Sequence, residues 1–346
     1  MVSTYSEAGV DIDASEKATK ALIAQIKGVN RKGDGEAIKL ENGFAGLVKL
    51  GDGALAICTD GVGSKLLLAE ELGSIHTVGI DCVAMNVNDL ICVGAEPLSF
   101  VDYVALDKPD EELMAKIGMG LAEGCRQSNC TLSGGETAIL PELVHGFDIA
   151  GTSVGYVKQD EIIDGTKIAE GDVLIGLESS GPHSNGYTLI RKLFDGNKEI
   201  GKQLIEPTRI YVKEVMDLIK QIDVHGIAHI TGGGLDNISR INDNFQYVID
   251  HPLPVPSVFD WLQEKGNVET KEMYRTFNMG MGMILVVDKN DAEKSVSILG
   301  DDAQIIGSVK NGIDDLFGLD QAVTQFKFIL FKIFLLLGPQ TLTVAK

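Results

Sequence analysis

The strongest constraint in this sequence is a short glycine-containing stretch, Cys58–Lys65, that reads CTDGVGSK. The apolar residues 54–57 before it are typical of a buried strand, and the apolar residues 66–72 after it favour a helix. Glycines permit a tight turn and a close backbone approach to a ligand, and a helix N-terminus favours an anion. The stretch is therefore either a plain tight turn with a surface lysine or one wall of a phosphate site.

Asp60 and Lys65 define the second of these interpretations. Lys65 would supply a positive charge for a phosphate, and Asp60 would supply an oxygen ligand for the magnesium ion that accompanies a nucleotide. We expect Gly61, Gly63 and Ser64 to line the same nucleotide site, because they form the turn between the strand and the helix.

The segment Ile80–Val93 adds a second acidic candidate. Apolar residues surround most of it, which predicts a well-buried helix. Asp81, Met85 and Asp89 are spaced four apart and so share one stripe of that helix. A buried carboxylate without a partner is costly, so it is normally paired or bound to metal. We expect Asp89 to be a metal ligand and a catalytic residue; the alternative places the stripe at the solvent edge.

A second glycine turn is predicted at Ser133–Ala138, after a short strand over residues 130–132. It carries one acid, Glu136, next to Gly135. We expect both residues to contact the nucleotide, with Glu136 as a further metal or ribose contact.

The second half of the chain contains donor-rich turns of its own. Ser179–Tyr187, SSGPHSNGY, lies between a predicted strand and a predicted helix, which Ser184 or Asn185 would cap. A phosphate would suit His183 beside that helix N-terminus; the alternative is a capping loop. Three consecutive glycines are usually tolerated where backbone touches a ligand. The predicted substrate contacts are His183, Ser184, Asn185, Thr231, Gly232, Gly233, Gly234 and Arg275.

Charge and motif content exclude several classes of function. The formal net charge of −20 argues against a nucleic-acid partner, which needs clustered lysine and arginine. The chain has no Walker A motif, no strict Rossmann fingerprint, no HExxH and no GxSxG. Acids plus a lysine at glycine turns therefore indicate an ATP-dependent enzyme of α/β type.

The cysteines and the chain ends bear on location. Five scattered cysteines without a CxxC pair, after an N-terminus unlike a signal peptide, favour a reducing cytosol. The apolar segment Phe326–Leu337 is too short to span a bilayer comfortably, since spanning takes about 20 residues. We therefore expect a cytoplasmic protein with no membrane partner, and we assign the segment no role.

The connection between two halves is expected at Asp160–Gly171, which contains two acid–glycine pairs. Before it, Ser15 is a candidate N-cap for a short amphipathic helix. Gly28–Gly46 is predicted to be a mobile loop, either a plain surface loop or a ligand flap. After the connection, Glu206–Lys220 is predicted to be a helix.

Six longer motifs occur in sequence and carry a family resemblance. They are DGVGSK, VAMNVNDLICVGAEP, LSGGETA, SSGPHSNGYTLIRK, HITGGG and MYRTFNMGMGM. With the early AGVDID they closely resemble the aminoimidazole ribonucleotide synthetase family, also called the phosphoribosylformylglycinamidine cyclo-ligases, over about residues 7–310. Two places differ from the family pattern: Asn42–Gly46 has fewer glycines, and the tail after about Gly312 matches nothing in it.

The resemblance implies a fold of class α/β (α+β), a two-domain synthetase fold. Residues 1–165 would bind ATP and contribute strands to a β-barrel shared across a homodimer. Residues 166–312 would form a layered mixed sheet with helices that binds the substrate, and residues 313–346 would be an atypical tail.

The resemblance also implies a reaction. ATP would drive ring closure of formylglycinamidine ribonucleotide to aminoimidazole ribonucleotide, releasing ADP and phosphate, in de novo purine (IMP) biosynthesis. In that reaction Asp60 and Asp89 would bind Mg²⁺, Lys65 would contact phosphate, and His183 would be the candidate for proton transfer, since imidazole titrates near neutrality.

Two other functions remain open at this point. A relative of the same architecture, such as selenophosphate synthetase, thiamine monophosphate kinase or a hydrogenase-maturation protein, would share ATP and the acids of the first half. A non-catalytic nucleotide-binding module is the other. The GPHSNGY and HITGGG motifs, with MYRTFN, favour the cyclo-ligase.

Overall fold

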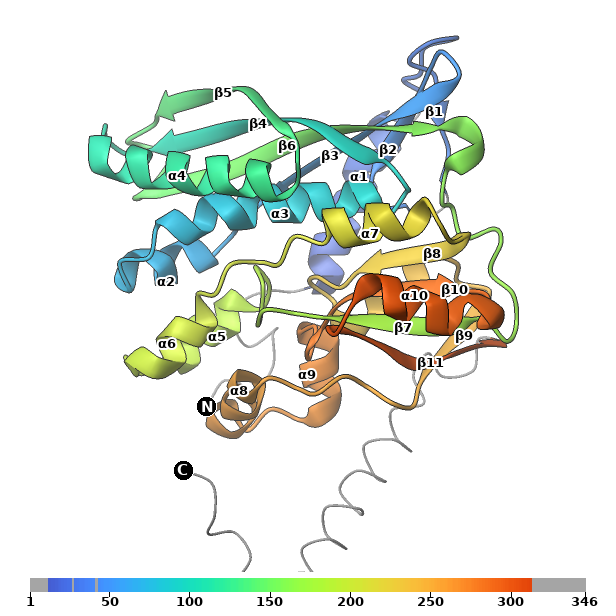
Figure 1. The fold of residues 1–346 in the computed structure, drawn as a ribbon. Coiled ribbons are helices and arrows are strands. Elements are labelled where there is room, and N and C mark those ends of the chain that lie inside the picture. Colours follow the sequence, from blue (N-terminus) through green and yellow to red (C-terminus); the bar gives the residue numbers. More distant parts are fainter. Residues whose placement is uncertain (1–11, 27, 41–42, 313–346) are drawn as a thin grey trace, which may run out of the picture.

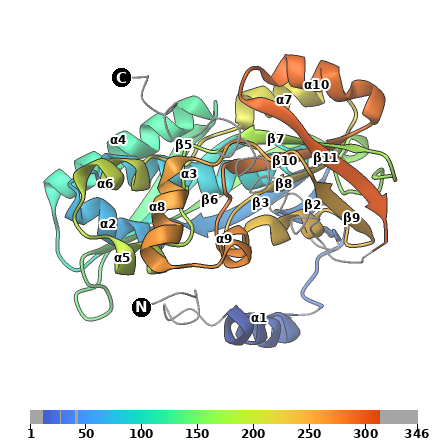
Figure 2. The same ribbon diagram turned by 90° about the horizontal axis from the view of Figure 1, so that it is seen from below.

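The computed structural model describes residues 12–26, 28–40 and 43–312, which form two β-sheets with helices around them (Figure 1). The motif AGVDID lies mostly outside these residues, and the tail 313–346 with its apolar segment lies wholly outside them. Helix α1 (Ile12–Ile26) begins before Ser15, so the predicted N-cap at Ser15 is wrong. Its apolar residues Leu22 and Ile26 are exposed, and Figure 2 shows the helix at the edge of the molecule.

The first sheet has the strand order β1-β2-β3-β6-β4-β5, and β4 and β5 are its parallel pair. Helices α3 and α4 cover one face of this sheet (Figure 1). The strands are β1 (Ala37–Ile38), β2 (Gly46–Leu50), β3 (Gly53–Gly61), β4 (Glu96–Leu106), β5 (Thr131–Ile139) and β6 (Phe147–Lys158), and the helices are α2 (Lys65–Glu71), α3 (His76–Ile91) and α4 (Glu111–Gln127).

The second sheet has the strand order β8-β10-β7-β11-β9, and every pair in it is antiparallel. All seven residues of β10 are buried, because β10 lies between β8 and β7 and both faces of the sheet are covered. The strands are β7 (Val173–Glu178), β8 (Val224–His229), β9 (Phe245–Ile249), β10 (Met281–Val287) and β11 (Ala303–Asn311). The helices are α5 (Tyr187–Leu193), α6 (Lys198–Leu204), α7 (Val212–Ile219), α8 (Ser257–Gly266), α9 (Thr270–Thr276) and α10 (Ala292–Leu299), with the 3-10 helices η1 (Gln159–Glu161), η2 (Gly234–Arg240) and η3 (Lys289–Asp291).

Helix α3 is as buried as its sequence predicts, because it lies between the first sheet and the second half of the chain. Its polar stripe does not face solvent: Asp81 and Asn88 are both fully buried. Close packing against α4 depends on glycine, since a Cβ at Gly120 would lie 2.1 Å from the His76 carbonyl oxygen.

Two further local predictions are wrong. Residues Ser133–Ala138 form no turn; they continue strand β5 through its pairing with β4. Residues 206–211 are not helical, because the Thr208 and Tyr211 amides donate to side chains of α3 (2.7 Å to Asp81 and 3.0 Å to Asn88) and not to a helix of their own. Helix α7 therefore begins only at Val212.

A buried ion pair within the first half makes hydrogen bonds to the second half. The ammonium group of Lys65, fully buried, lies 2.9 Å from the Asp81 carboxylate, which is also fully buried. It also donates to the main-chain oxygens of His183 and Glu206, each at 2.7 Å. A lysine ammonium has three N–H donors, so these three acceptors satisfy it completely.

Asp81 connects the same two halves from the acidic side. Besides Lys65, its Oδ1 accepts bonds from the hydroxyl of Thr208 at 2.6 Å and the hydroxyl of Ser184 at 3.2 Å. A buried charge is tolerated only when it is paired and hydrogen-bonded in this way. The ion pair thus fixes how the second half sits against α3.

Within the described ranges, none of the helices combines the length and apolar character needed to cross a bilayer.

We predict that Lys65→Met destabilises the protein strongly. Removing one partner of a buried ion pair leaves the other charge unpaired, at a cost of about 3–5 kcal/mol. The free energy of unfolding in urea measures the effect. Lys116→Met is the matched control, because Lys116 forms an exposed pair with Glu112, and we expect it to change stability by less than about 1 kcal/mol. A Lys65→Met protein as stable as wild type but unable to bind ATP would contradict this and restore the sequence interpretation of Lys65.

Candidate functional site

The two halves meet at a second polar contact, between Asp89 on α3 and His229 at the end of β8. The Nδ1 atom of His229 lies 2.9 Å from Oδ1 of Asp89, and the imidazole is fully buried. The other carboxylate oxygen of Asp89 accepts a bond from the Cys58 thiol at 3.5 Å. Asp89 is therefore a mostly buried carboxylate held from both sides.

Asp60 lies beside Asp89 at the end of strand β3. Its Oδ1 accepts the Gly61 amide at 2.7 Å, and its own main-chain oxygen accepts a bond from Asn86 of α3. Asp60 keeps exposed surface, yet desolvation of its carboxyl group and the nearby Asp89 charge raise its pKa. Desolvation, with Asp89 and Asp60 adding to it, also raises the pKa of the Cys58 thiol, which places the two acids around the same group.

Asp60 and Asp89 fit the chemistry of a magnesium site that is completed by its ligand. Within the described residues no three His, Cys, Asp or Glu side chains are grouped to hold a metal ion by themselves. Magnesium takes oxygen ligands, keeps several waters, and is usually bound by one or two carboxylates plus the phosphates of the substrate. Two neighbouring carboxylates, one of them exposed, meet that requirement.

Lys65 does not lie in this site, so its predicted contact with phosphate is wrong. The side chain points away from the turn and into the junction, where its three donors are used. Burial lowers its pKa and the Asp81 charge opposes that change. The turn itself remains: Gly61, Gly63 and Ser64 connect β3 to α2, and a Cβ at Gly63 would meet no atom within 4 Å.

His183 is fully buried, which changes its expected role. Burial, followed by the His229, Lys65 and Arg209 charges, lowers its pKa well below the usual value, so the imidazole stays neutral. Its Nε2 accepts the Ser180 amide at 3.3 Å, and its Nδ1 has no hydrogen-bond partner among the described residues. This burial argues against proton exchange by His183 near neutral pH, and that role stays a prediction.

The turn after His183 does not cap helix α5 with a side chain. The N-cap is Gly186, and Ser184 bonds Asp81 and Thr208 instead. Asn185 lies against the triple glycine: a Cβ at Gly232 would be 3.2 Å from its Oδ1. Its Nδ2 is buried without a partner among the described residues, so this amide is a free donor beside Gly232.

The segment Thr231–Gly234 forms an open backbone turn between β8 and η2. Gly233 and Gly234 have φ angles of 94° and 57°, and a Cβ at Gly234 would lie 2.0 Å from the Tyr274 carbonyl oxygen. Gly232 is exposed. The turn therefore requires glycine at Gly234 for packing and presents Gly232 to solvent near Asn185.

Gly135 and Glu136 do not join this cluster within one chain. Strand register aligns Glu136 with Tyr103, Ala150 and Gly61, whereas Gly135 aligns with Asp102, Gly151 and Asp60. Paired residues share a face of the sheet and successive residues alternate. Glu136 consequently projects from the face opposite to that of Asp60.

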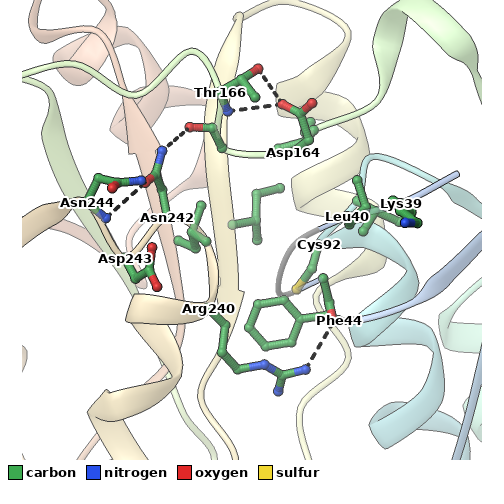
Figure 3. Close-up of a pocket in the computed structure, with 16 residues that line it drawn as sticks. Lys39, Leu40, Phe44, Cys92, Asp164, Thr166, Arg240, Asn242, Asp243 and Asn244 are labelled. Atoms are coloured by element: carbon green, nitrogen blue, oxygen red, sulfur yellow. Dashed lines mark hydrogen bonds between the residues drawn. The ribbon is translucent and has the colours of Figure 1, made fainter. Parts of the chain in front are cut away.

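Arg275 is also peripheral. Its side chain is exposed and lies 3.7 Å from the Asp236 carboxylate, so it forms a surface ion pair. Arg240, at the end of η2, is more central, because its guanidinium lies 4.0 Å over the ring of Phe44 from the first half (Figure 3).

Phe44 and Arg240 form one side of a cavity of about 370 Å³ between the two halves (Figure 3). Its other walls come from the end of α3, the connection between the sheets and the loop after η2. None of the predicted site residues lines it.

Sequence reasoning missed two residues that the structure brings to the site, His229 and Arg240. His229 lies in the quoted motif HITGGG, so its place directly before the glycines was a usable signal. Nothing in the local sequence marks Arg240, because its partner Phe44 is remote in the chain.

Two family models match the chain. The N-terminal domain of the AIR synthase related proteins matches residues 43–157, and the C-terminal domain of the same proteins matches residues 169–315.

Curated relatives are similar along almost the whole chain. A phosphoribosylformylglycinamidine cyclo-ligase of Methanosarcina barkeri is 48% identical over 324 residues, covering 90% of this chain and 96% of the relative. The protein of the same name from Methanocaldococcus jannaschii is 46% identical over 329 residues, covering 90% and 93%.

Solved structures share the fold at low identity. A chain of the HypE–HypF complex superposes with a TM-score of 0.63 at 17% identity, covering 85% of this chain and 94% of that one. The structure titled AaThiL complexed with AMPPCP and TMP also gives 0.63, at 15% identity and 86% and 91% coverage. These similarities support the two-domain α/β architecture.

We predict that His183 makes the protein less stable in mild acid. Unfolded His183 takes up a proton below its ordinary pKa and native His183 does not, so stability is full above that pKa and is lost as pH falls. From about pH 7 to about pH 5.5 this one group should cost about 1 kcal/mol.

Unfolding in urea at the two pH values measures this loss. His183→Asn should lack it, and asparagine suits the φ angle of 60° at this position. His251→Asn is the matched control, since His251 is exposed. An equal loss in wild type and His183→Asn would show that His183 does not stay neutral.

Proposed function

The chain belongs to the phosphoribosylformylglycinamidine cyclo-ligase family, and from this premise we propose which role each of its site residues has in the reaction. The enzyme closes the imidazole ring of aminoimidazole ribonucleotide from formylglycinamidine ribonucleotide, uses ATP, and releases ADP and phosphate in de novo purine biosynthesis. The observation that carries this conclusion is identity of 48% to such an enzyme over 90% of the chain.

The chemistry needs a better leaving group. A formamide oxygen leaves poorly, so it first takes the γ-phosphoryl group of ATP and ADP departs. The amidine-side nitrogen then attacks the activated carbon, the ring closes, and phosphate leaves with the former formyl oxygen. Phosphoryl transfer of this kind depends mainly on positioning and on neutralising charge.

Asp60 and Asp89 are the proposed magnesium ligands, directly or through water. Bound Mg²⁺ would supply charge neutralisation for the triphosphate. The support is the neighbouring placement of the two carboxylates at the end of β3 and on α3. The turn Gly61–Ser64 would lie beside the phosphates, because it follows Asp60 directly and has open space at Gly63.

His229 is proposed to orient Asp89. An imidazole that bonds one carboxylate oxygen leaves the carboxylate in a single orientation, as outer-shell partners do in metal sites. This contact also ties the nucleotide half to the start of the triple-glycine turn, two residues further along the chain.

The substrate is proposed to lie between Asn185 and the turn Thr231–Gly234. Asn185 offers an unused amide donor, and the turn offers backbone beside it. Backbone and amide donors bind a phosphate or the reacting amide without a charged side chain. His183 stabilises the turn that carries Asn185, because its Nε2 accepts the Ser180 amide.

A homodimer is proposed on the open face of the first sheet. Ile57, Val101 and Tyr103 share that face and are 41%, 39% and 44% exposed. Exposed apolar surface of this kind on a sheet commonly marks an interface. A second copy of the chain is the proposed occupant, in agreement with the shared barrel that the family resemblance implies.

We also propose a domain boundary near residues 165/166 and a cytosolic location. The chain leaves the first sheet at Lys158 and enters the second at Val173, so the boundary would lie in the connection. All five cysteines are free thiols, which suits a reducing compartment.

We predict that Asp60→Asn lowers kcat by about 10²-fold in an assay with formylglycinamidine ribonucleotide, ATP and Mg²⁺ that detects the aromatic amine product. The variant should unfold no earlier than wild type. The pKa of Asp60 is raised in the folded state, so its ionisation at neutral pH disfavours folding, and asparagine removes that effect.

Asp148→Asn is the matched control, since Asp148 accepts the next residue's amide in the same way but lies on β6 away from Asp89. Wild-type turnover that yields no amine product would contradict the assigned reaction. Full activity of Asp60→Asn would remove Asp60 from the magnesium site.

We predict that Val101→Glu converts a dimer to a monomer. A charge buried in an apolar interface would be unpaired, and interface association would fall by at least about tenfold. Sedimentation velocity at fixed protein concentration measures this. Met119→Glu, at an exposed position on α4, is the control and should sediment as wild type. A wild-type protein that sediments at the mass of one chain would overturn the dimer.

A further inference from the structure

Arg240 makes three contacts that join the two halves of the chain. Its guanidinium lies 4.0 Å over the Phe44 ring, and Nη2 donates to the Gly43 main-chain oxygen at 3.2 Å. Its Nη1 donates to Oδ1 of Asn237 at 3.3 Å. Phe44 and Gly43 belong to the first half of the chain, and Asn237 belongs to the second half. Figure 3 shows Arg240 beside Phe44.

Asn237 connects Arg240 to the triple glycine through hydrogen bonds. The residue is 5% exposed, and its Nδ2 donates to the main-chain oxygens of Gly232 and Gly234 at 3.0 and 2.9 Å. Glycines have no side chains to hold their own conformation, so an unconstrained triple glycine would sample many backbone states. The amide of Asn237 therefore holds both ends of that turn.

The orientation of Asn237 depends in turn on Arg240. An asparagine amide can flip its oxygen and nitrogen, and a flip would turn Oδ1 toward two carbonyl oxygens. A guanidinium donor on Oδ1 favours the orientation in which Nδ2 faces Gly232 and Gly234. The planar fork of arginine can serve Gly43 and Asn237 at once, which a lysine ammonium on a flexible stem does poorly.

Phe44 in turn fixes the guanidinium. Phe44 is 8% exposed and packs in the core that includes Cys92, the residue directly after α3. A cation over an aromatic face at this distance is attracted to it, more strongly where solvent is excluded. The chain of contacts thus runs from Phe44 through Arg240 and Asn237 to the glycine turn.

We propose that Arg240 is a positioning residue for the ring-closure reaction. Held by Phe44 and Gly43, it orients Asn237, which fixes the backbone of Gly232–Gly234 for the substrate. This inference rests on the proposed function in one respect, the placement of the ribonucleotide at that turn. Its consequence is that Phe44, a residue of the nucleotide half, sets the affinity of the other half for the ribonucleotide.

The expected kinetic signature is a change in KM. A turn that holds the ribonucleotide equally in the ground and transition states affects KM and leaves kcat nearly unchanged. We expect Arg240→Met to raise KM for formylglycinamidine ribonucleotide about tenfold, with KM for ATP and kcat within about threefold of wild type. Arg240→Lys keeps the charge over Phe44 without the fork and should recover only part of the loss.

A double-mutant cycle tests the route of the effect. Phe44 and Asn237 are linked through Arg240, so the effects of Phe44→Leu and Asn237→Ser on KM should be non-additive by at least about twofold in the wild-type background. In the Arg240→Met background the same two changes should become additive, because the link is gone. Arg126→Met, at an exposed position on α4, is the control and should keep wild-type constants.

Thermal unfolding of each variant ensures that only folded proteins are compared, and Arg240→Lys serves if Arg240→Met does not fold. Additive effects in the wild-type background, or a rise in KM for ATP in place of the ribonucleotide, would overturn the inference. Gly232→Ala separates it from the proposed function. If Gly232→Ala leaves the KM for the ribonucleotide unchanged, the proposed substrate site at the turn is wrong. If Gly232→Ala raises that KM but the Arg240 variants do not, only the proposed role of Arg240 is wrong.

Discussion

The buried ion pair between Lys65 and Asp81 is the interaction on which the rest of the structure depends. Desolvating two charges costs several kcal/mol per ion, so the pair is tolerated only because every donor of Lys65 is used. Its partners include the main-chain oxygen of His183, in the second half. The pair thereby places the His183 turn against α3, which brings the turn near the acids.

Helix α3 carries both halves of the site because its two faces have different neighbours. One face packs on the first sheet and on α4, and the polar stripe faces the second half. Asp81 and Asn88 anchor the segment before α7, and Asp89 reaches His229. A carboxylate at the end of such a stripe is buried enough to be oriented and still lies beside the exposed Asp60.

The proposed substrate site relies on backbone more than on charge. In the proposed site the turn Thr231–Gly234 would bind the substrate through main-chain groups, and such groups need an outside constraint to hold one conformation. Asn237 and Arg240 supply that constraint, and Phe44 connects it to the nucleotide half. This arrangement would let one enzyme bind ATP and the ribonucleotide substrate in adjoining parts of the junction between the two halves.

The sequence by itself determined the local elements and the family. Apolar patterns predicted β3 and the buried α3, because burial patterns repeat within a few residues. Six motifs in order indicated the reaction. Glycine clusters misled at Ser133–Ala138, where pairing with β4 overrides the turn preference of glycine.

Only the tertiary structure decided which polar groups meet. It turned Lys65 inward, kept His183 neutral, placed Glu136 on the opposite face, and paired Asp89 with His229, a residue 140 positions away. The physical reason is that a polar side chain takes the partner that packing brings to it. That partner lies far along the chain, so no local pattern identifies it.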